Sequence, residues 1–250
     1  MKYGVQLYSL RDVTGVDFDN ALAQVAKMGY SLVESAGFFG HSAEEVKAIL
    51  DKHGLVLCST HTKFAEIDAD IDSVIEFHRA VGCKDIIIPG APQSTKADVD
   101  HLVDVINAAQ PKVEAAGMRL HFHNHSKEFM PNDDGLYVEE ELAKRTKVFF
   151  ELDTFWIFNA GLDPLEIIDK YADRVLFVHV KDGIPQDFSN PESRPVGKSL
   201  GSGKAPVEAV RAKAIEMGLT MVVESEGLDP TGPEEVQRCI EFLKELDAKG

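Results

Sequence analysis

The stretch VFFELDT at residues 148–154 is a short apolar run that ends in polar residues, and VLFVHVKD at residues 175–182 repeats this pattern. Short apolar or β-branched runs separated by longer segments of helical periodicity are typical of βαβ units. Six further runs of this kind occur, at residues 3–9, 31–37, 55–61, 85–90, 119–125 and 220–227. Eight such units predict a (β/α)8 barrel.

Helical segments fill the intervals between these runs. Amphipathic patterns occupy residues 17–30, 42–54, 96–118 and 205–218, and glycines stand at positions 29, 54, 82, 117 and 218, where a helix should end. The chain has 250 residues, of which 44% are hydrophobic, and no charge run or Pro/Gly-rich linker divides it. About 200–250 residues is normal for one α/β barrel. We therefore expect a single TIM barrel domain over residues 1–250.

Composition excludes several classes of partner. The formal net charge of -16 repels phosphate backbones and anionic membrane surfaces. No stretch has the roughly 18 apolar residues of a membrane span, and the N-terminus does not resemble a signal peptide. Cys58, Cys83 and Cys239 lack metal-ligand spacing, so we expect buried reduced thiols. These features predict a cytoplasmic protein without a nucleic-acid or membrane partner, and they are compatible with a homo-oligomer.

One long segment breaks the pattern. Residues 183–204 follow the seventh strand and are too polar and too rich in Pro and Gly for a regular element. Loops after the strands lie on the carboxyl face of a barrel, where active sites are built. We expect this segment to be a lid or a wall facing the substrate.

Polar side chains near the ends of seven strands should converge on the same mouth. They are Gln6, Tyr8, Glu34, His61, His123, His125, Asp153, His179, Lys181, Asp182, Glu224 and Glu226. Asp153, His179 and Glu224 end the sixth, seventh and eighth strands. Two carboxylates and one imidazole suit Mn, Mg, Fe, Co or Zn, so we expect one divalent metal ion.

Several motifs carry a family resemblance. ELDTFW at 151–156, FVHVKD at 177–182, VVESEG at 222–227, LGSG at 200–203 and FHNHSKEF at 122–129 appear in this order. The chain resembles the xylose isomerase-like TIM barrels of the sugar phosphate isomerase/epimerase superfamily, in a subgroup with HNH on the fifth strand. The resemblance implies one divalent metal held by a fifth-strand residue together with Asp153, His179 and Glu224.

The fifth strand departs from the family pattern. Family members that epimerise keto sugars place a metal-binding Glu there, whereas this strand offers histidines. His123 matches the ligand position best, and His121 on the same side of the strand is the alternative. A neutral imidazole can ligate metal and can also transfer a proton near pH 7. Glu128, from the following loop, is a further carboxylate that could face the substrate.

The sixth strand separates the chain from another group of relatives. The endonuclease IV group, which acts on DNA at abasic sites, binds three zinc ions and needs a His three residues after the sixth-strand Asp. Trp156 stands there instead. We expect Trp156 to pack on a sugar ring, and an idle core or interface aromatic is the alternative.

These features predict a metal-dependent sugar isomerase or epimerase that acts through an enediolate on a keto sugar, a sugar derivative or a polyol. Glu224 is the expected base, and His123, His125 or Glu128 is expected to return the proton. Lys181 would steady the oxyanion, and His61 and Tyr8 would contact substrate.

Two alternative functions remain. A metal-dependent lyase or dehydratase acting on keto-glycosides or inososes would use the same metal ligands. A non-catalytic sugar-binding barrel is the other alternative. The sequence LGSGK, which ends at Lys204, only weakly resembles a phosphate loop. An unphosphorylated substrate is therefore favoured.

Overall fold

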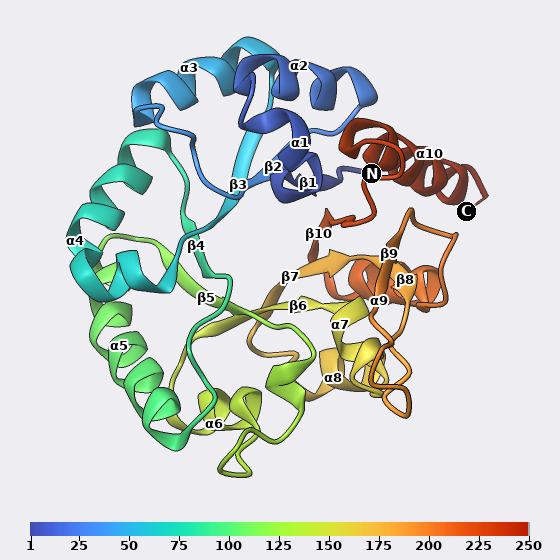
Figure 1. Ribbon diagram of the computed structural model, residues 1–250. Coiled ribbons are helices and arrows are strands. Elements are labelled where there is room, and N and C mark those ends of the chain that lie inside the picture. The colour runs from blue at the N-terminus through green and yellow to red at the C-terminus, as the bar shows by residue number, and fades with distance from the viewer. Residues whose placement is uncertain (250) are drawn as a thin grey trace.

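Eight parallel strands close into a barrel in the computed structural model, which describes residues 1–249 (Figure 1). The strands are β1 (Gly4–Gln6), β2 (Leu32–Ser35), β3 (Val56–His61), β4 (Asp85–Ile88), β5 (Arg119–His123), β6 (Phe149–Asp153), β7 (Val175–Val180) and β10 (Thr220–Val223). Their order around the barrel is β1-β10-β7-β6-β5-β4-β3-β2. Each strand lies within one of the eight predicted runs, so the predicted (β/α)8 fold is confirmed.

Helices surround the barrel on the outside (Figure 1). They are α1 (Arg11–Thr14), α2 (Phe18–Met28), α3 (Ala43–His53), α4 (Phe64–Val81), α5 (Lys96–Ala115), α6 (Val138–Arg145), α7 (Thr154–Asn159), α8 (Pro164–Lys170), α9 (Val207–Met217) and α10 (Gly232–Lys249), with short 3-10 helices η1 (Leu7–Leu10) and η2 (Lys127–Phe129). Local signals set their ends. Ser42 and Glu45 form a capping box at the start of α3, and Gly54 ends that helix in the left-handed conformation.

The strands divide their side chains between two environments. On β5, Leu120 and Phe122 are buried in the apolar layer between the sheet and the helices. His121 and His123 alternate with them, and alternate residues of a strand point to opposite faces. His123 packs its ring beside those of His61 and His179, at centroid distances of 4.9 and 4.7 Å. Strand alternation therefore places histidines inside the barrel and apolar residues outside it.

The segment at residues 183–204 contains more regular structure than the sequence indicates. β8 (Asp182–Ile184) pairs antiparallel with β9 (Val196–Lys198) to form a separate two-stranded sheet. The Asp182 carboxylate accepts hydrogen bonds from the backbone N–H groups of Gly201 and Gly203, at 3.0 and 2.8 Å. It also accepts from Gly183 at 2.8 Å and Ala205 at 3.0 Å. One buried carboxylate thus ties both ends of the segment together.

Within residues 1–249, no helix has the length and apolar sequence needed to cross a membrane. The thiols of Cys58, Cys83 and Cys239 are all free, and the latter two are buried.

Candidate active site

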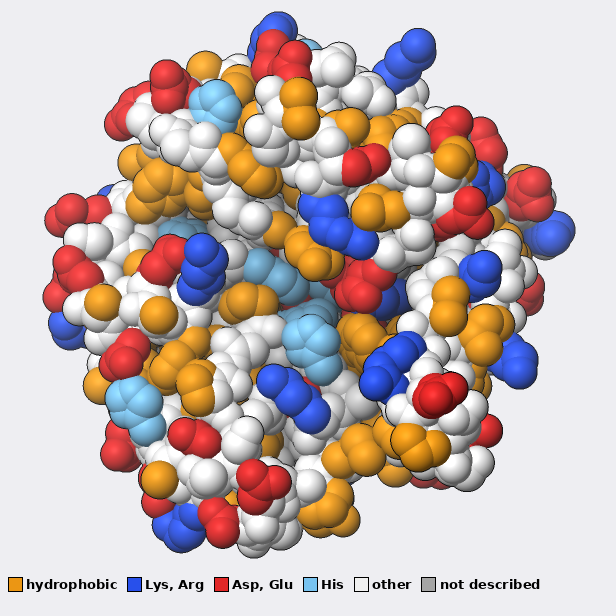
Figure 2. Space-filling view, in the orientation of Figure 1, with side chains coloured by type: hydrophobic (Ala, Val, Ile, Leu, Met, Phe, Trp, Pro, Cys, Tyr) orange, Lys and Arg blue, Asp and Glu red, His pale blue; other side chains and the backbone are white. Residues whose placement is uncertain are grey.

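A cavity of about 1150 Å³ opens at the carboxyl end of the barrel. Histidine side chains gather in the hollow at the centre of this face (Figure 2). Of the residues that the sequence assigns to the site, seven line the cavity: Tyr8, His61, His123, His125, Trp156, Glu224 and Glu226. The cavity therefore lies where active sites of (β/α)8 barrels are found.

Four potential metal ligands form a cluster, of which two, His123 and Glu224, line this cavity. His123, Asp153, His179 and Glu224 each offer one ligand atom, and these atoms lie within 4.8 Å of one another. All four residues are buried, with exposed fractions of 4% or less. The Asp153 Oδ2 atom is buried and lacks a hydrogen-bond partner among residues 1–249. Since buried polar atoms are normally satisfied, this orphaned oxygen fits the position of a metal ligand.

Lys181 supplies the positive charge beside these carboxylates. Its Nζ donates to Glu224 at 3.0 Å and to Glu226 at 2.7 Å, and lies 3.4 Å from Asp153 Oδ2. Burial would raise the pKa of Glu224, but the ammonium of Lys181 and the His179 ring hold it well below its usual value. Burial raises the pKa of Asp153 to about 7, despite the opposing charge of Lys181. Glu224 is therefore the carboxylate that stays ionised and able to accept a proton.

The ring of His179 connects the ligand cluster to a deeper layer of the barrel. Its Nε2 lies 2.7 Å from Glu34 Oε1, and its Nδ1 lies 3.3 Å from Glu224 Oε2. Burial and the charge of Glu151 raise the pKa of Glu34. A hydrogen bond from Nε2 to Glu34 fixes the ring orientation and leaves Nδ1 facing Asp153 and Glu224.

Glu151 is the centre of that deeper layer, and it is not among the site residues predicted from the sequence. Its Oε2 lies 2.8 Å from His61 Nε2 and 3.1 Å from His123 Nδ1. Glu151 stands two residues before Asp153 on β6, so strand alternation alone places both carboxylates inside the barrel. That spacing was the signal in the sequence that could have identified it.

A second group of four donors exists in this layer, formed by His61, His123, Glu151 and His179. It shares two members with the first group. Its carboxylate already contacts all three histidines, at 2.8 to 3.2 Å. Each group contains one buried carboxylate oxygen without a hydrogen-bond partner among residues 1–249, Glu151 Oε1 in the second and Asp153 Oδ2 in the first. In the second group, however, the three imidazole nitrogens already contact Glu151 Oε2, so we take the first group as the better metal site.

The structure separates His121 from the ligand cluster. Its Nε2 lies 2.8 Å from Asp85 Oδ1, and its ring packs edge-on against Phe177 at 5.3 Å. Asp85 also accepts two hydrogen bonds from Arg119, at 2.6 and 2.7 Å. His121 is therefore bound to a carboxylate away from the ligand group, and His123 is the fifth-strand residue in that group.

Glu128 lies apart from the position expected of a residue that contacts substrate. It is fully buried and does not line the cavity. Its carboxylate accepts from the His125 backbone N–H at 2.7 Å and from Gln93 Nε2 at 2.6 Å. Glu128 thus supports the turn that carries His125, and its assignment to direct substrate contact needs correction.

The expected lid also requires correction, because residues 183–204 contribute no side chain to the cavity lining. The hydrogen bonds to Asp182 hold this segment against its own strand ends. The walls come instead from the loops after β2 and β3 and from α4, including Phe38, Phe39 and Phe77. These aromatic residues were not identified from the sequence.

Trp156 and His125 form one wall near the ligands. Lys181 Nζ lies 4.7 Å from the centroid of the Trp156 ring, and the His125 ring lies 5.7 Å from it. Burial lowers the pKa of His125, so its imidazole is neutral at pH 7. His125 Nδ1 is buried without a hydrogen-bond partner in the described part of the chain. This wall offers a flat apolar surface beside a neutral imidazole.

The closed (β/α)8 barrel thus carries a buried cluster of donors that could hold a divalent metal ion. Residues 22–246 match the family of xylose isomerase-like TIM barrels, and the chain belongs to this family.

Named relatives agree with this family. An inosose dehydratase from Geobacillus kaustophilus is 25% identical over 245 residues, covering 83% of this chain and 80% of the relative. A 2-oxo-tetronate isomerase from Haemophilus influenzae is 27% identical over 204 residues, covering 71% and 78%. The crystal structure of a sugar phosphate isomerase/epimerase from Parabacteroides distasonis superposes with a TM-score of 0.79 and 26% identity, covering 97% of this chain and 93% of the other. The relatives named here are enzymes.

Proposed function

We propose that this chain is a divalent-metal-dependent isomerase or epimerase that acts on a keto sugar, a sugar derivative or a polyol through an enediolate. The observation that carries the proposal is the group of His123, Asp153, His179 and Glu224, whose ligand atoms lie within 4.8 Å of one another in a cavity wide enough for a sugar. One Mn, Mg, Zn, Co or Fe ion would suit two carboxylates and two imidazoles.

The ligand residues would act through the atoms that they direct to the cavity. His179 would use Nδ1, because its Nε2 is bonded to Glu34 at 2.7 Å. His123 would use Nε2, because its Nδ1 contacts Glu151 at 3.1 Å. A bound divalent metal would polarise the substrate carbonyl and stabilise negative charge on its oxygen.

Glu224 and His125 are the residues that would transfer protons next to the substrate carbonyl. Glu224 would remove the proton from the carbon next to the carbonyl, since Lys181 at 3.0 Å keeps its carboxylate ionised. His125, which lines the cavity, would take up a proton from solvent and donate it to carbon as the imidazolium, and its lowered pKa makes that imidazolium a stronger acid. Lys181 would compensate the developing negative charge, and Trp156 would pack against the apolar face of the ring.

An unphosphorylated substrate fits the charges around the cavity. The backbone N–H groups of Gly201 and Gly203 in the LGSGK loop, and of Ala205 directly after it, would be the donors to an anion. They donate instead to the Asp182 carboxylate, at 2.8 to 3.0 Å. A phosphate would have to displace that carboxylate. The cavity lining also carries four carboxylates, Glu66, Asp70, Glu224 and Glu226, against the single ammonium of Lys63.

A lyase or dehydratase is the second candidate, because the inosose dehydratase of Geobacillus kaustophilus is similar over 83% of this chain. The first step is the same, and His125, as the imidazolium, would then protonate the leaving oxygen, so that water or an alcohol departs. A non-catalytic sugar-binding barrel is less well supported, since all four ligand positions carry donors.

The test is hydrogen exchange in D2O. The metal-loaded protein would be incubated with ketoses, keto-glycosides, inososes and their phosphates, and followed by NMR. Deuterium should enter a carbon next to the carbonyl of an unphosphorylated compound, and release of water or an alcohol would identify the lyase. Exchange in phosphorylated sugars alone would refute the unphosphorylated substrate, and the absence of exchange from every compound would refute the proposed chemistry.

A further inference from the structure

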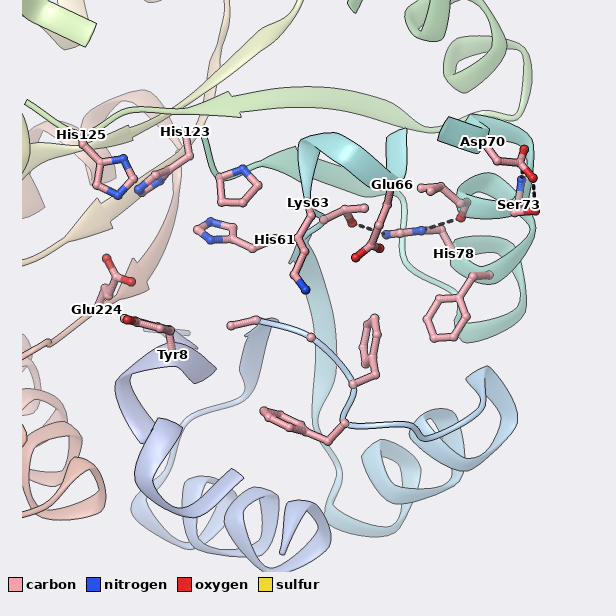
Figure 3. A pocket seen from close by; sticks show the side chains of 18 of the residues that line it. Tyr8, His61, Lys63, Glu66, Asp70, Ser73, His78, His123, His125 and Glu224 are labelled. Carbon is pink, nitrogen blue, oxygen red and sulfur yellow. Dashed lines mark hydrogen bonds between the residues drawn. The ribbon is translucent and has the colours of Figure 1, made fainter. Parts of the chain in front are cut away.

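The cavity extends well beyond the metal-ligand cluster. Tyr8, His123, His125 and Glu224 lie at one end, and Asp70, Ser73 and His78 lie at the other, with His61 and Lys63 between them (Figure 3). Its volume of about 1150 Å³ exceeds the roughly 300–1,000 Å³ of pockets that hold drug-sized molecules. A single sugar ring would fill only the ligand end.

The far end, which we call the aromatic chamber, is lined by Phe38, Phe39, Val74 and Phe77. The rings of Phe38 and Phe77 lie 4.8 Å apart between centroids, with an interplanar angle of 39°. Neither of these two side chains is fully buried, and Phe39 is 49% exposed. Large apolar groups that stay accessible inside a cavity indicate an apolar ligand.

Ser73 and His78, two polar residues at the aromatic chamber, already have partners. Ser73 donates from its hydroxyl to Asp70 Oδ2 at 2.6 Å and from its backbone N–H to Oδ1 at 3.2 Å. Both nitrogens of His78 are used, at 2.6 Å from Thr60 Oγ1 and 2.7 Å from the Val74 carbonyl oxygen. A second sugar could reach charged partners only at Lys63 and Glu66. Hydroxyl groups packed against Phe38 and Phe77 would be desolvated without partners, which is unfavourable.

The loop that carries two of the rings adopts an unusual backbone conformation. It has the sequence GFFG, and Phe39 has φ of 52°, a region that bulky residues rarely adopt. Such conformations persist where the surrounding structure holds them, and they are common at ligand sites. Here the loop directs Phe38 toward Phe77 of α4. The aromatic surface thus depends on a strained turn.

We infer that the substrate is a keto sugar or polyol derivative with an aromatic or similarly planar apolar substituent, which binds in the aromatic chamber while the sugar lies at the ligand cluster. This inference rests on the proposed function for the sugar end. It adds that the substrate is a conjugate, such as a keto-glycoside with an aryl aglycone, and that Phe38 and Phe77 determine this specificity.

Binding of matched ligands tests the inference without turnover. Phenyl β-glucoside and methyl β-glucoside would be titrated into the metal-loaded full-length protein by calorimetry. Trp156 is the only tryptophan and lines the same cavity, so its fluorescence reports whether the ligand occupies the site. Because burial of an aromatic ring contributes substantially to affinity, the phenyl compound should bind about 10- to 100-fold more tightly.

Variants of Phe38 and Phe77 test whether the preference for the phenyl compound arises in the aromatic chamber. Phe38→Ala and Phe77→Ala should each reduce the preference for the phenyl compound by about tenfold while binding of the methyl compound changes little. Phe38→Leu and Phe77→Leu, which keep apolar volume, provide the same comparison if the alanine variants unfold. Phe188→Ala is the matched control, because Phe188 is 51% exposed and lies outside the cavity lining. It should retain the full preference.

The outcomes separate this inference from the proposed function. Equal affinity for the two glucosides, a preference that survives in the variants of both Phe38 and Phe77, or no binding of either compound would overturn the inference. Deuterium exchange on a methyl keto-glycoside without any phenyl preference would refute the aromatic chamber alone. A phenyl preference lost in the variants, without exchange on any keto compound, would refute the proposed reaction and leave the binding site supported.

Discussion

Replacement of Glu224 by Gln is the most direct test of how the site works. The amide keeps the shape of the side chain and one oxygen, but it cannot accept a proton at neutral pH. General base catalysis contributes about 100- to 10,000-fold, or about 2.7–5.4 kcal/mol of transition-state stabilisation at 1.36 kcal/mol per tenfold change. We expect kcat to fall within this range in Glu224→Gln.

The structure indicates that the fold should survive the change. Lys181 keeps Glu226 at 2.7 Å and Asp153 at 3.4 Å after Glu224 loses its charge, so a buried ammonium is not left unpaired. We therefore expect the free energy of unfolding to drop by no more than about 1–2 kcal/mol. For a chain of this size that corresponds to a decrease in Tm of about 2–8 °C.

The assay combines deuterium exchange in D2O, metal content by elemental analysis and thermal unfolding. Glu226→Gln is the matched control, since it also removes a carboxylate bonded to Lys181 but lies outside the ligand group. Its kcat should fall less than about tenfold, below the range expected of a general base. If metal-loaded Glu224→Gln turns over within about tenfold of wild type, Glu224 is not the base, and the assignment moves to His123 or His125.

Three further predictions follow from the charges inside the barrel. Elemental analysis should find about one divalent metal ion per chain, because the two donor groups share two histidines; two or more equivalents would contradict this. Lys181→Met should destabilise the metal-free protein by about 3–5 kcal/mol, because the carboxylates beside it lose their cation. A free energy of unfolding equal to that of wild type would contradict this. Asp85→Asn should lower stability at pH 7. Burial opposes ionisation of Asp85, but hydrogen bonds from His121 and Arg119 lower its pKa, so its contribution is present above about pH 3.9 and is lost as pH falls through the folded pKa. The stability gap to wild type, measured in urea at several pH values, should shrink below pH 3.9, and a constant gap would disprove the linkage.

Much of the fold could be read from local signals. Each of the eight strands forms where a short apolar run stands, and helices such as α3 begin at a capping box and end at a glycine. These signals depend on a few neighbouring residues, so they can be recognised without knowledge of the tertiary structure. The hairpin of β8 and β9 was missed because its pairing depends on Asp182, whose backbone donors lie up to 23 residues away.

The candidate site, too, could be predicted only in part from the sequence. The sequence by itself determined that carboxylates and histidines end consecutive strands, because strand period and barrel topology bring strand ends to one mouth. Only the tertiary structure decided between His121 and His123, since the partner of each, Asp85 or Glu151, comes from a neighbouring strand. The aromatic chamber was likewise invisible, because the loop after β2 and the helix α4 meet only when the barrel closes. Local sequence encodes elements and the direction of side chains, whereas contacts between distant segments depend on how strand register and helix packing place them.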